Sequence, residues 1–182
     1  MKEKNFFLSL NKEALSERIK LEPAYCHIAK GCYLAEISFS DNLSSLLPYL
    51  KPQVKALYYE PENLLIFKWK RGNKFYKVSL KGETLKFGTV SDREEAREVF
   101  FELFDYLKEL SLKFDNIEPD YKPVKRPQAL VIYKYLPKTN CKECGEMTCL
   151  ALAAKISMGE AEPENCPHLT EESLNELRSL LE

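Results

Sequence analysis

Short runs of alternating apolar and polar residues dominate the middle of the chain. One run covers residues 33–39, and four more cover residues 54–59, 64–70, 74–80 and 84–88. Alternation with a period of two is typical of strands that bury one face, and the segments between the last four runs carry the proline, glycine and asparagine of turns. The pattern predicts an antiparallel meander.

A helical pattern follows the last of these strands. Ser91 and Glu94 have the spacing of a capping box, and the apolar residues after them recur every three or four positions, which predicts a long helix over one face of the sheet. We expect one more helix in the first 30 residues, where Leu10, Leu15 and Ile19 form a thin apolar stripe. The stripe of the long helix consists of Ala96, Val99, Phe100, Leu103, Leu107 and Leu110.

The order of these elements over residues 33–112 resembles one half of the TATA-binding protein fold. A strand and a short helix are followed by four strands and the long helix. The resemblance concerns layout alone, because no binding or catalytic motif accompanies it and a fold does not determine a function. It implies an α+β unit with an antiparallel sheet and covering helices.

Three prolines separate this unit from the rest of the chain. Pro119, Pro123 and Pro127 stand four residues apart among charged residues, a pattern typical of an extended connector. We therefore predict a sheet domain over residues 1–115, a linker over residues 116–128 and a small helical domain over residues 129–182. The last segment holds 5 basic and 9 acidic side chains, a net charge of −4, against +3 for the residues before it.

The overall composition is that of a folded chain without a dominant electric field. Apolar residues make up 45% of the 182 residues and the formal net charge is −1. No stretch approaches the roughly 18 to 20 uncharged apolar residues of a membrane span, and the first residues lack the apolar core of a signal peptide. These features predict a cytoplasmic protein with no membrane insertion, in which clustered cysteines indicate metal ligation or redox chemistry rather than disulfides.

Four of the six cysteines lie close together near the end of the chain. Cys141, Cys144, Cys149 and Cys166 have the spacing CxxCx4Cx16C. A 4Fe-4S cluster takes one thiolate for each iron, and two cysteines three residues apart can hold one edge of the cube. The pattern therefore predicts a 4Fe-4S cluster on these four residues.

Zinc is the alternative, because four cysteines also make a tetrahedral structural site. A zinc ribbon usually pairs two CxxC turns, whereas here Cys149 and Cys166 stand singly. Residues 142–165 also contain no histidine. We favour iron and sulfide, with zinc left as the open alternative.

The residues around the cysteines resemble a known family. The LPKTNC segment, the CxxCGxxTC core and the closing CPHL closely resemble the N-terminal cluster domain of the corrinoid iron-sulfur protein large subunit, also called the gamma subunit of acetyl-CoA decarbonylase/synthase. The resemblance implies a low-potential 4Fe-4S cluster that passes single electrons. Lys142 stands where that family usually has glycine, and Met147 stands where proline is common.

The corrinoid-binding parts of that large subunit cannot fit into the remaining 128 residues. The resemblance therefore implies the cluster and its four ligands, and it does not imply a bound corrinoid. The chain shows no glycine-rich phosphate loop and no Ser-His-Asp arrangement. We expect an electron-transfer or accessory protein rather than a catalyst, with a redox protein as partner, plausibly in anaerobic corrinoid or one-carbon metabolism.

Three other features are weaker candidates. Cys26, His27 and Cys32 are ligand types without a fourth ligand nearby, so we interpret them as ordinary residues. His168 is expected on the surface of the CPHL turn. Lysines interleaved with aromatic residues over residues 66–86 suit nucleic-acid binding, but they also suit a sheet with one solvated face. A non-enzymatic nucleic-acid or protein binding module with a structural cluster or zinc site is therefore the competing function.

Overall fold

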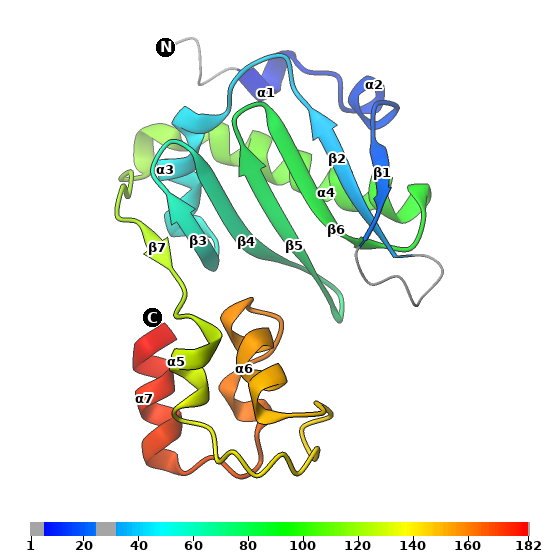
Figure 1. Ribbon diagram of the computed structural model, residues 1–182. Coiled ribbons are helices and arrows are strands. Elements are labelled where there is room, and N and C mark those ends of the chain that lie inside the picture. Colours follow the sequence, from blue (N-terminus) through cyan, green and yellow to red (C-terminus); the bar gives the residue numbers. More distant parts are fainter. Residues whose placement is uncertain (1–5, 25–31, 182) are drawn as a thin grey trace. The chain divides into compact units, whose positions relative to one another are not determined.

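The computed structural model describes residues 6–24 and 32–181, and it divides the chain into two compact units, residues 1–124 and 125–182. The first unit is α+β, built on a seven-stranded antiparallel sheet (Figure 1), which confirms the predicted fold class. The strand order is β1-β2-β6-β5-β4-β3-β7. The strands are β1 Lys20–Pro23, β2 Tyr33–Ser38, β3 Ala56–Glu60, β4 Leu64–Arg71, β5 Lys74–Lys81, β6 Thr84–Val90 and β7 Val124–Lys125.

The meander from β3 to β6 forms as the alternation predicts. Each strand pairs with the next, and β2 closes on β6 with Glu36 opposite Lys86. Gly72 and Gly82 lie in the turns before β5 and β6 with φ of 57° and 55°, in the left-handed region that favours glycine. Turn chemistry and strand alternation therefore determine this part of the sheet together.

Helix α4 (Arg93–Leu112) covers one face of the sheet (Figure 1). Its buried residues are Ala96, Val99, Phe100, Leu103, Phe104, Leu107, Leu110 and Ser111, which confirms the predicted stripe. The cap lies one residue later than predicted. Asp92 is the N-cap and accepts a hydrogen bond from the Glu95 backbone, while the Glu95 carboxylate accepts one from the Ser91 backbone at 2.6 Å.

The first residues do not form the single helix that we expected. Helices α1 (Phe6–Ser9) and α2 (Lys12–Ser16) are short, and β1 then adds an edge strand to β2. Leu15 and Ile19 still enter the core. A charged, proline-ended segment such as KLEP has little strand signal of its own, so its pairing with β2 decides its structure.

The remaining short elements of the first unit flank the sheet. Leu43, Leu46, Leu47 and Leu50 are buried around η2 (Ser44–Leu46) and α3 (Leu47–Leu50), which η3 (Lys51–Gln53) follows. After α4 and η4 (Phe114–Asn116), Asp120 pairs with Lys51 at 2.5 Å. Val124 packs against the same core. The division between the units thus falls inside the proline-rich segment.

The second unit consists of short helices around a small core. The helices are α5 (Ala129–Tyr133), α6 (Cys149–Ser157), η5 (Pro163–Asn165) and α7 (Glu171–Leu181). Thr148 caps α6, because its hydroxyl accepts a hydrogen bond from the Ala151 backbone at 3.0 Å. The core contains Ile132, Leu136, Cys149, Leu152, Ala153, Ile156, Cys166 and Leu177. Two of the predicted ligands are therefore core residues.

Candidate iron-sulfur site

The four candidate cysteines differ sharply in burial. Cys149, the first residue of α6, is 6% exposed, and Cys166, at the end of η5, is 7% exposed. Cys144 is half-buried and Cys141 is exposed. None of the four forms a disulfide. The site therefore has two ligands fixed in the core and one ligand at the surface.

The loop before α6 has an unusual backbone. Lys138, Asn140 and Lys142 have φ of 62°, 52° and 67°, in the left-handed region, and Gly145 has φ of 84°. The Gly145 backbone donates to the Lys142 carbonyl at 2.9 Å, which closes a turn around Cys144. Lys142 thus occupies a conformation that favours glycine, the residue that the related domains usually carry there.

Hydrogen bonds attach this loop to the start of α6. The Asn140 side chain accepts from the Cys149 backbone at 2.9 Å, so both ends of the loop are joined through one amide. Cys149 is the first residue of α6. The loop that carries Cys141 and Cys144 is therefore attached to the helix at a third candidate ligand.

Cys166 lies within electrostatic range of the other three candidate cysteines. Burial raises the pKa of the Cys166 thiol, the His168 backbone N–H lowers it, and the charges of Cys149, Cys144 and Cys141 raise it again. The chain thus brings three further sulfur donors near Cys166, at the edge of the small core. This donor set fits an iron-sulfur cluster, and four thiolates also satisfy zinc.

Two acidic side chains around the site have a cationic partner. Glu146 pairs with Lys155, and Glu164 pairs with Arg178 at 2.7 Å. A carboxylate paired with a cation has a weaker field than a free one. Lys155 also lies within electrostatic range of Cys144, and the hydrogen bond to Glu146 raises its pKa. The local field is therefore more balanced than the acidic composition indicates.

One group at the site was missed by the sequence analysis. The ligand-capable atoms of Cys141, Glu143 and His168 all lie within 4.8 Å of one another, and all three residues are exposed. His168 Nε2 lies 3.0 Å from a Glu143 carboxylate oxygen. His168 is on the surface, as expected, but it does not stand alone there. Its 25-residue separation from Glu143 gives no sequence signal for this contact.

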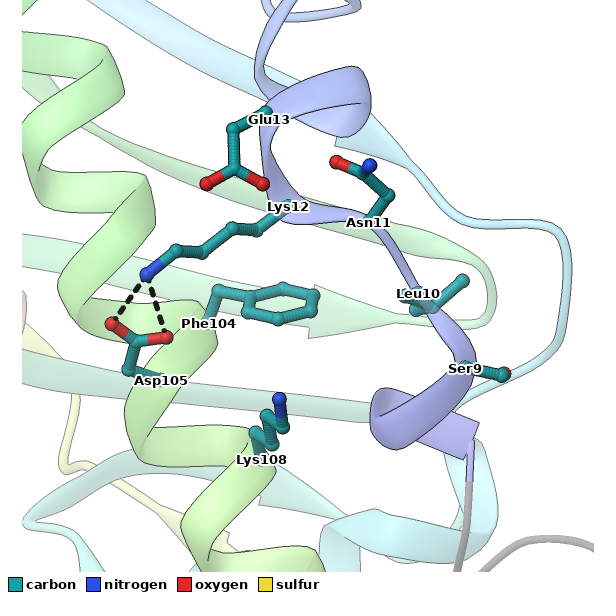
Figure 2. Close-up of a pocket in the computed structure, with 8 residues that line it drawn as sticks. All are labelled: Ser9, Leu10, Asn11, Lys12, Glu13, Phe104, Asp105 and Lys108. Atoms are coloured by element: carbon teal, nitrogen blue, oxygen red, sulfur yellow. Dashed lines mark hydrogen bonds and ion pairs between the residues drawn. The ribbon is translucent and has the colours of Figure 1, made fainter.

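The other candidates do not gather into a site in the described residues. Cys26 and His27 lie outside them, and Cys32 is half-buried just before β2. Figure 2 shows a pocket of about 390 Å³ in the first unit, where Lys12 donates to both carboxylate oxygens of Asp105 at 2.9 and 2.8 Å. The charges of Lys12 and Asp105 therefore neutralise each other within the pocket. Among the described residues, no cysteine or histidine lines it.

The sheet face away from α4 is basic. Lys68 lies opposite Lys77, and Lys70 lies opposite Phe75, whose side chain is 56% exposed. The ammonium groups of Lys68 and Lys70 each lie 5.7 Å from the centre of the Phe75 ring. On the opposite face Trp69 contacts Tyr106 of α4. Lys68, Lys70 and Lys77 thus share a face with an exposed aromatic ring, whereas Lys74 pairs with Glu95 of α4 on the other face.

Comparison with known proteins identifies the cysteine segment. Residues 136–168 match the FeS family model, described as "Putative Fe-S cluster". The chain is 49% identical over 53 residues to the acetyl-CoA decarbonylase/synthase complex subunit gamma of Methanopyrus kandleri, covering 29% of this chain and 12% of the relative. It is 50% identical over 42 residues to the corrinoid/iron-sulfur protein large subunit of Moorella thermoacetica, covering 23% and 9%. These matches confirm the predicted resemblance of the C-terminal segment.

The similarity is confined to that segment. The chain spans only about a tenth of the length of these relatives, and no solved structure matches it. In residues 6–24 and 32–181, no helix combines the length and the apolar character needed to cross a membrane.

Proposed function

We propose that this protein holds a low-potential 4Fe-4S cluster on Cys141, Cys144, Cys149 and Cys166 and serves one-electron transfer or redox support of a partner. The observation that carries the proposal is the set of four free thiols, two in the core and three within electrostatic range of Cys166, inside the segment that matches an iron-sulfur family. When bound, such a cluster accepts and releases one electron at a time.

The order of the cysteines and the family match favour a cluster over zinc. A zinc ribbon usually pairs two CxxC turns, whereas here Cys149 and Cys166 stand singly. Residues 136–168 match an iron-sulfur family model.

The chain's own residues would shift the reduction potential in two opposite directions, upward through partial positive charge and downward through missing hydrogen-bond donors. The N-terminus of α6 and the His168 backbone N–H present partial positive charge to Cys149 and Cys166. Pro163 and Pro167 lack an N–H, which limits the number of hydrogen bonds to sulfur near Cys166 and keeps the potential low.

The proposed partner and pathway are inferred only from the names of the relatives. The relatives are subunits of an acetyl-CoA decarbonylase/synthase complex or of a corrinoid/iron-sulfur protein. We infer a protein partner of redox function, in the cytoplasm, in one-carbon or corrinoid metabolism. A corrinoid site of this chain's own is not part of the proposal, because the match covers only the cluster segment.

The first unit would then serve recognition. We infer that residues 1–115 and 129–182 are separate domains, and that the sheet unit has the layout of half of a TATA-binding protein. The order β2, α3, β3 to β6 and α4 supports this layout. The basic sheet face around Phe75 favours the second candidate, a nucleic-acid or protein binding module whose cluster or zinc is structural.

Reduction of the purified protein separates these functions. Anaerobic protein should lose visible absorbance on addition of dithionite and develop the paramagnetic signal of a cluster reduced by one electron. A cluster that cannot be reduced at the potential of dithionite, or a colourless zinc protein, would favour the structural role. The Cys149→Ala variant provides the control without the cluster.

A further inference from the structure

We propose that His168, held by Glu143, is an alternative ligand for the iron that Cys141 binds. The proposal rests on the proposed function, because it concerns one corner of the same cluster. It begins from the group of Cys141, Glu143 and His168, whose ligand-capable atoms lie within 4.8 Å of one another. No other cysteine of the site belongs to such a group in the described part of the chain.

The backbone holds both partners of Cys141 in place. His168 follows Cys166 by two residues, its backbone N–H bonds to the Cys166 sulfur, and Cys166 is anchored in the core. Glu143 follows Cys141 by two residues in the loop that the turn around Cys144 closes. The position of the His168 imidazole near Cys141 is therefore fixed by its proximity to the buried residue Cys166.

The carboxylate of Glu143 lies against the imidazole of His168. Nε2 lies 3.0 Å from a carboxylate oxygen. A carboxylate beside a metal-binding histidine orients the ring. Glu143 is thus a positioning residue for His168.

Burial explains why only this corner has a second ligand. Cys149 and Cys166 are surrounded by Ile132, Leu152 and other apolar side chains, while Cys141 is exposed to water. Water and oxidants reach the Cys141 thiolate first. In the exchange, the bond from iron to the Cys141 sulfur breaks, the bond from iron to the His168 nitrogen forms, and the released thiolate takes a proton from solvent. No electron is transferred.

Ligand variants of the full chain test the proposal. The metal content of the wild-type protein is measured first. Iron supports the proposed cluster, whereas zinc in place of iron contradicts both the proposed function and this inference. Cys141→Ala should keep about four irons per chain, and pulsed EPR of its reduced cluster should show a directly bound nitrogen. The double variant Cys141→Ala with His168→Ala should keep about three irons and no nitrogen coupling.

Two controls isolate the contribution of His168. Cys144→Ala, whose position has no histidine beside it, should not keep the fourth iron. Within the Cys141→Ala background, Glu143→Gln should retain the nitrogen signal and Glu143→Ala should weaken it, since glutamine can still accept from the ring. Equal iron content and equal EPR spectra in Cys141→Ala and the double variant would overturn the proposal.

The variant His168→Ala keeps all four cysteines and tests the proposal even if Cys141→Ala fails to fold. His168→Ala should carry a normal cluster but lose its fourth iron several-fold faster than wild type under mild oxidation in the presence of a chelator. Equal rates of iron loss in the two proteins would contradict a role for His168 at this corner.

Discussion

Lys142 has a backbone conformation that glycine adopts with less strain. Its φ of 67° costs a residue with a Cβ about 1 kcal/mol, and it directly follows the exposed candidate ligand Cys141 in the chain. A lysine at this position therefore adds positive charge next to Cys141 at the expense of backbone strain.

Replacement of Lys142 should change the potential of the cluster more than the stability of the fold. In Lys142→Gly the relief of strain is partly offset by the greater freedom of the unfolded chain, so the free energy of unfolding should change by less than about 1 kcal/mol. Loss of the positive charge should lower the reduction potential, measured by redox titration. Lys142→Asn, which also tolerates this φ, is the matched control, and a raised potential in both variants would contradict the assignment.

At the scale of residues, the sequence predicts the ligand types and misses their neighbours. The spacing of Cys141, Cys144, Cys149 and Cys166 indicates a cluster because each iron needs one thiolate. The contact of Glu143 with His168 depends on how two loops approach each other, and no periodicity or motif encodes that distance. The ligand assignment itself remains a prediction.

The Glu95 carboxylate of helix α4 connects the start of the helix to strand β5. Glu95 accepts hydrogen bonds from Lys74 and Tyr76 at 2.5 Å and from Ser91 at 2.6 and 2.8 Å. Burial raises its pKa, but the hydrogen bonds from Lys74, Tyr76 and Ser91 outweigh burial and lower it to about 2. The helix cap and the sheet contact are thus one ionised network.

Acid should weaken this network in a defined window. Because the folded pKa of Glu95 lies below its ordinary value of 4.5, its contribution is fully present above pH 4.5 and is lost as the pH falls toward 2. We expect Glu95→Gln to cost about 2 kcal/mol at pH 7 and to flatten the fall in stability between pH 4.5 and 3. Urea unfolding at both pH values measures this, with the exposed neighbour Glu94→Gln as control. An unchanged fall in Glu95→Gln would contradict the role of Glu95.

Strand β6 requires glycine at the position that pairs with Leu34 of β2. A Cβ on Gly88 would lie 2.8 Å from Leu34 Cδ2 and 2.9 Å from the Tyr33 carbonyl oxygen, at the irregularity in the β2–β6 register. Gly88→Ala should therefore destabilise the sheet unit by about 1 to 3 kcal/mol in chemical unfolding. Ser79→Ala on β5 should change stability by less than about 0.5 kcal/mol. Equal effects of the two variants would show that β2 and β6 accommodate a Cβ at position 88 without loss of stability.

At the scale of elements, periodic patterns predict the helices and strands whose formation depends on local sequence. The β3–β6 meander and the α4 stripe follow from alternation, turns and a capping signal. Strand β1 does not, because its pairing with β2 overrides a weak local preference. The cap of α4 was predicted one residue early, since Ser91 and Asp92 are both capping residues and the sequence alone does not choose between them.

At the scale of the whole molecule, the two compact units should respond differently to loss of the cluster. Removing the cluster removes a cross-link from the small core of residues 125–182, which contains Cys149 and Cys166, whereas the core of the first unit contains none of the four candidate ligands. Amide hydrogen exchange should therefore accelerate over residues 137–168 in Cys149→Ala and stay unchanged in β4, β5 and α4. Cys32→Ala should leave exchange over residues 137–168 as in wild type. Acceleration in the strands of the sheet after cluster loss would argue against two independent domains.

The metal content of wild-type protein purified without exposure to oxygen tests the central claim most directly. Four thiolates spread between a core and a surface loop predict about four irons and about four sulfides per chain, without stoichiometric zinc. One zinc per chain and no iron, in protein that never met oxygen, would contradict the account.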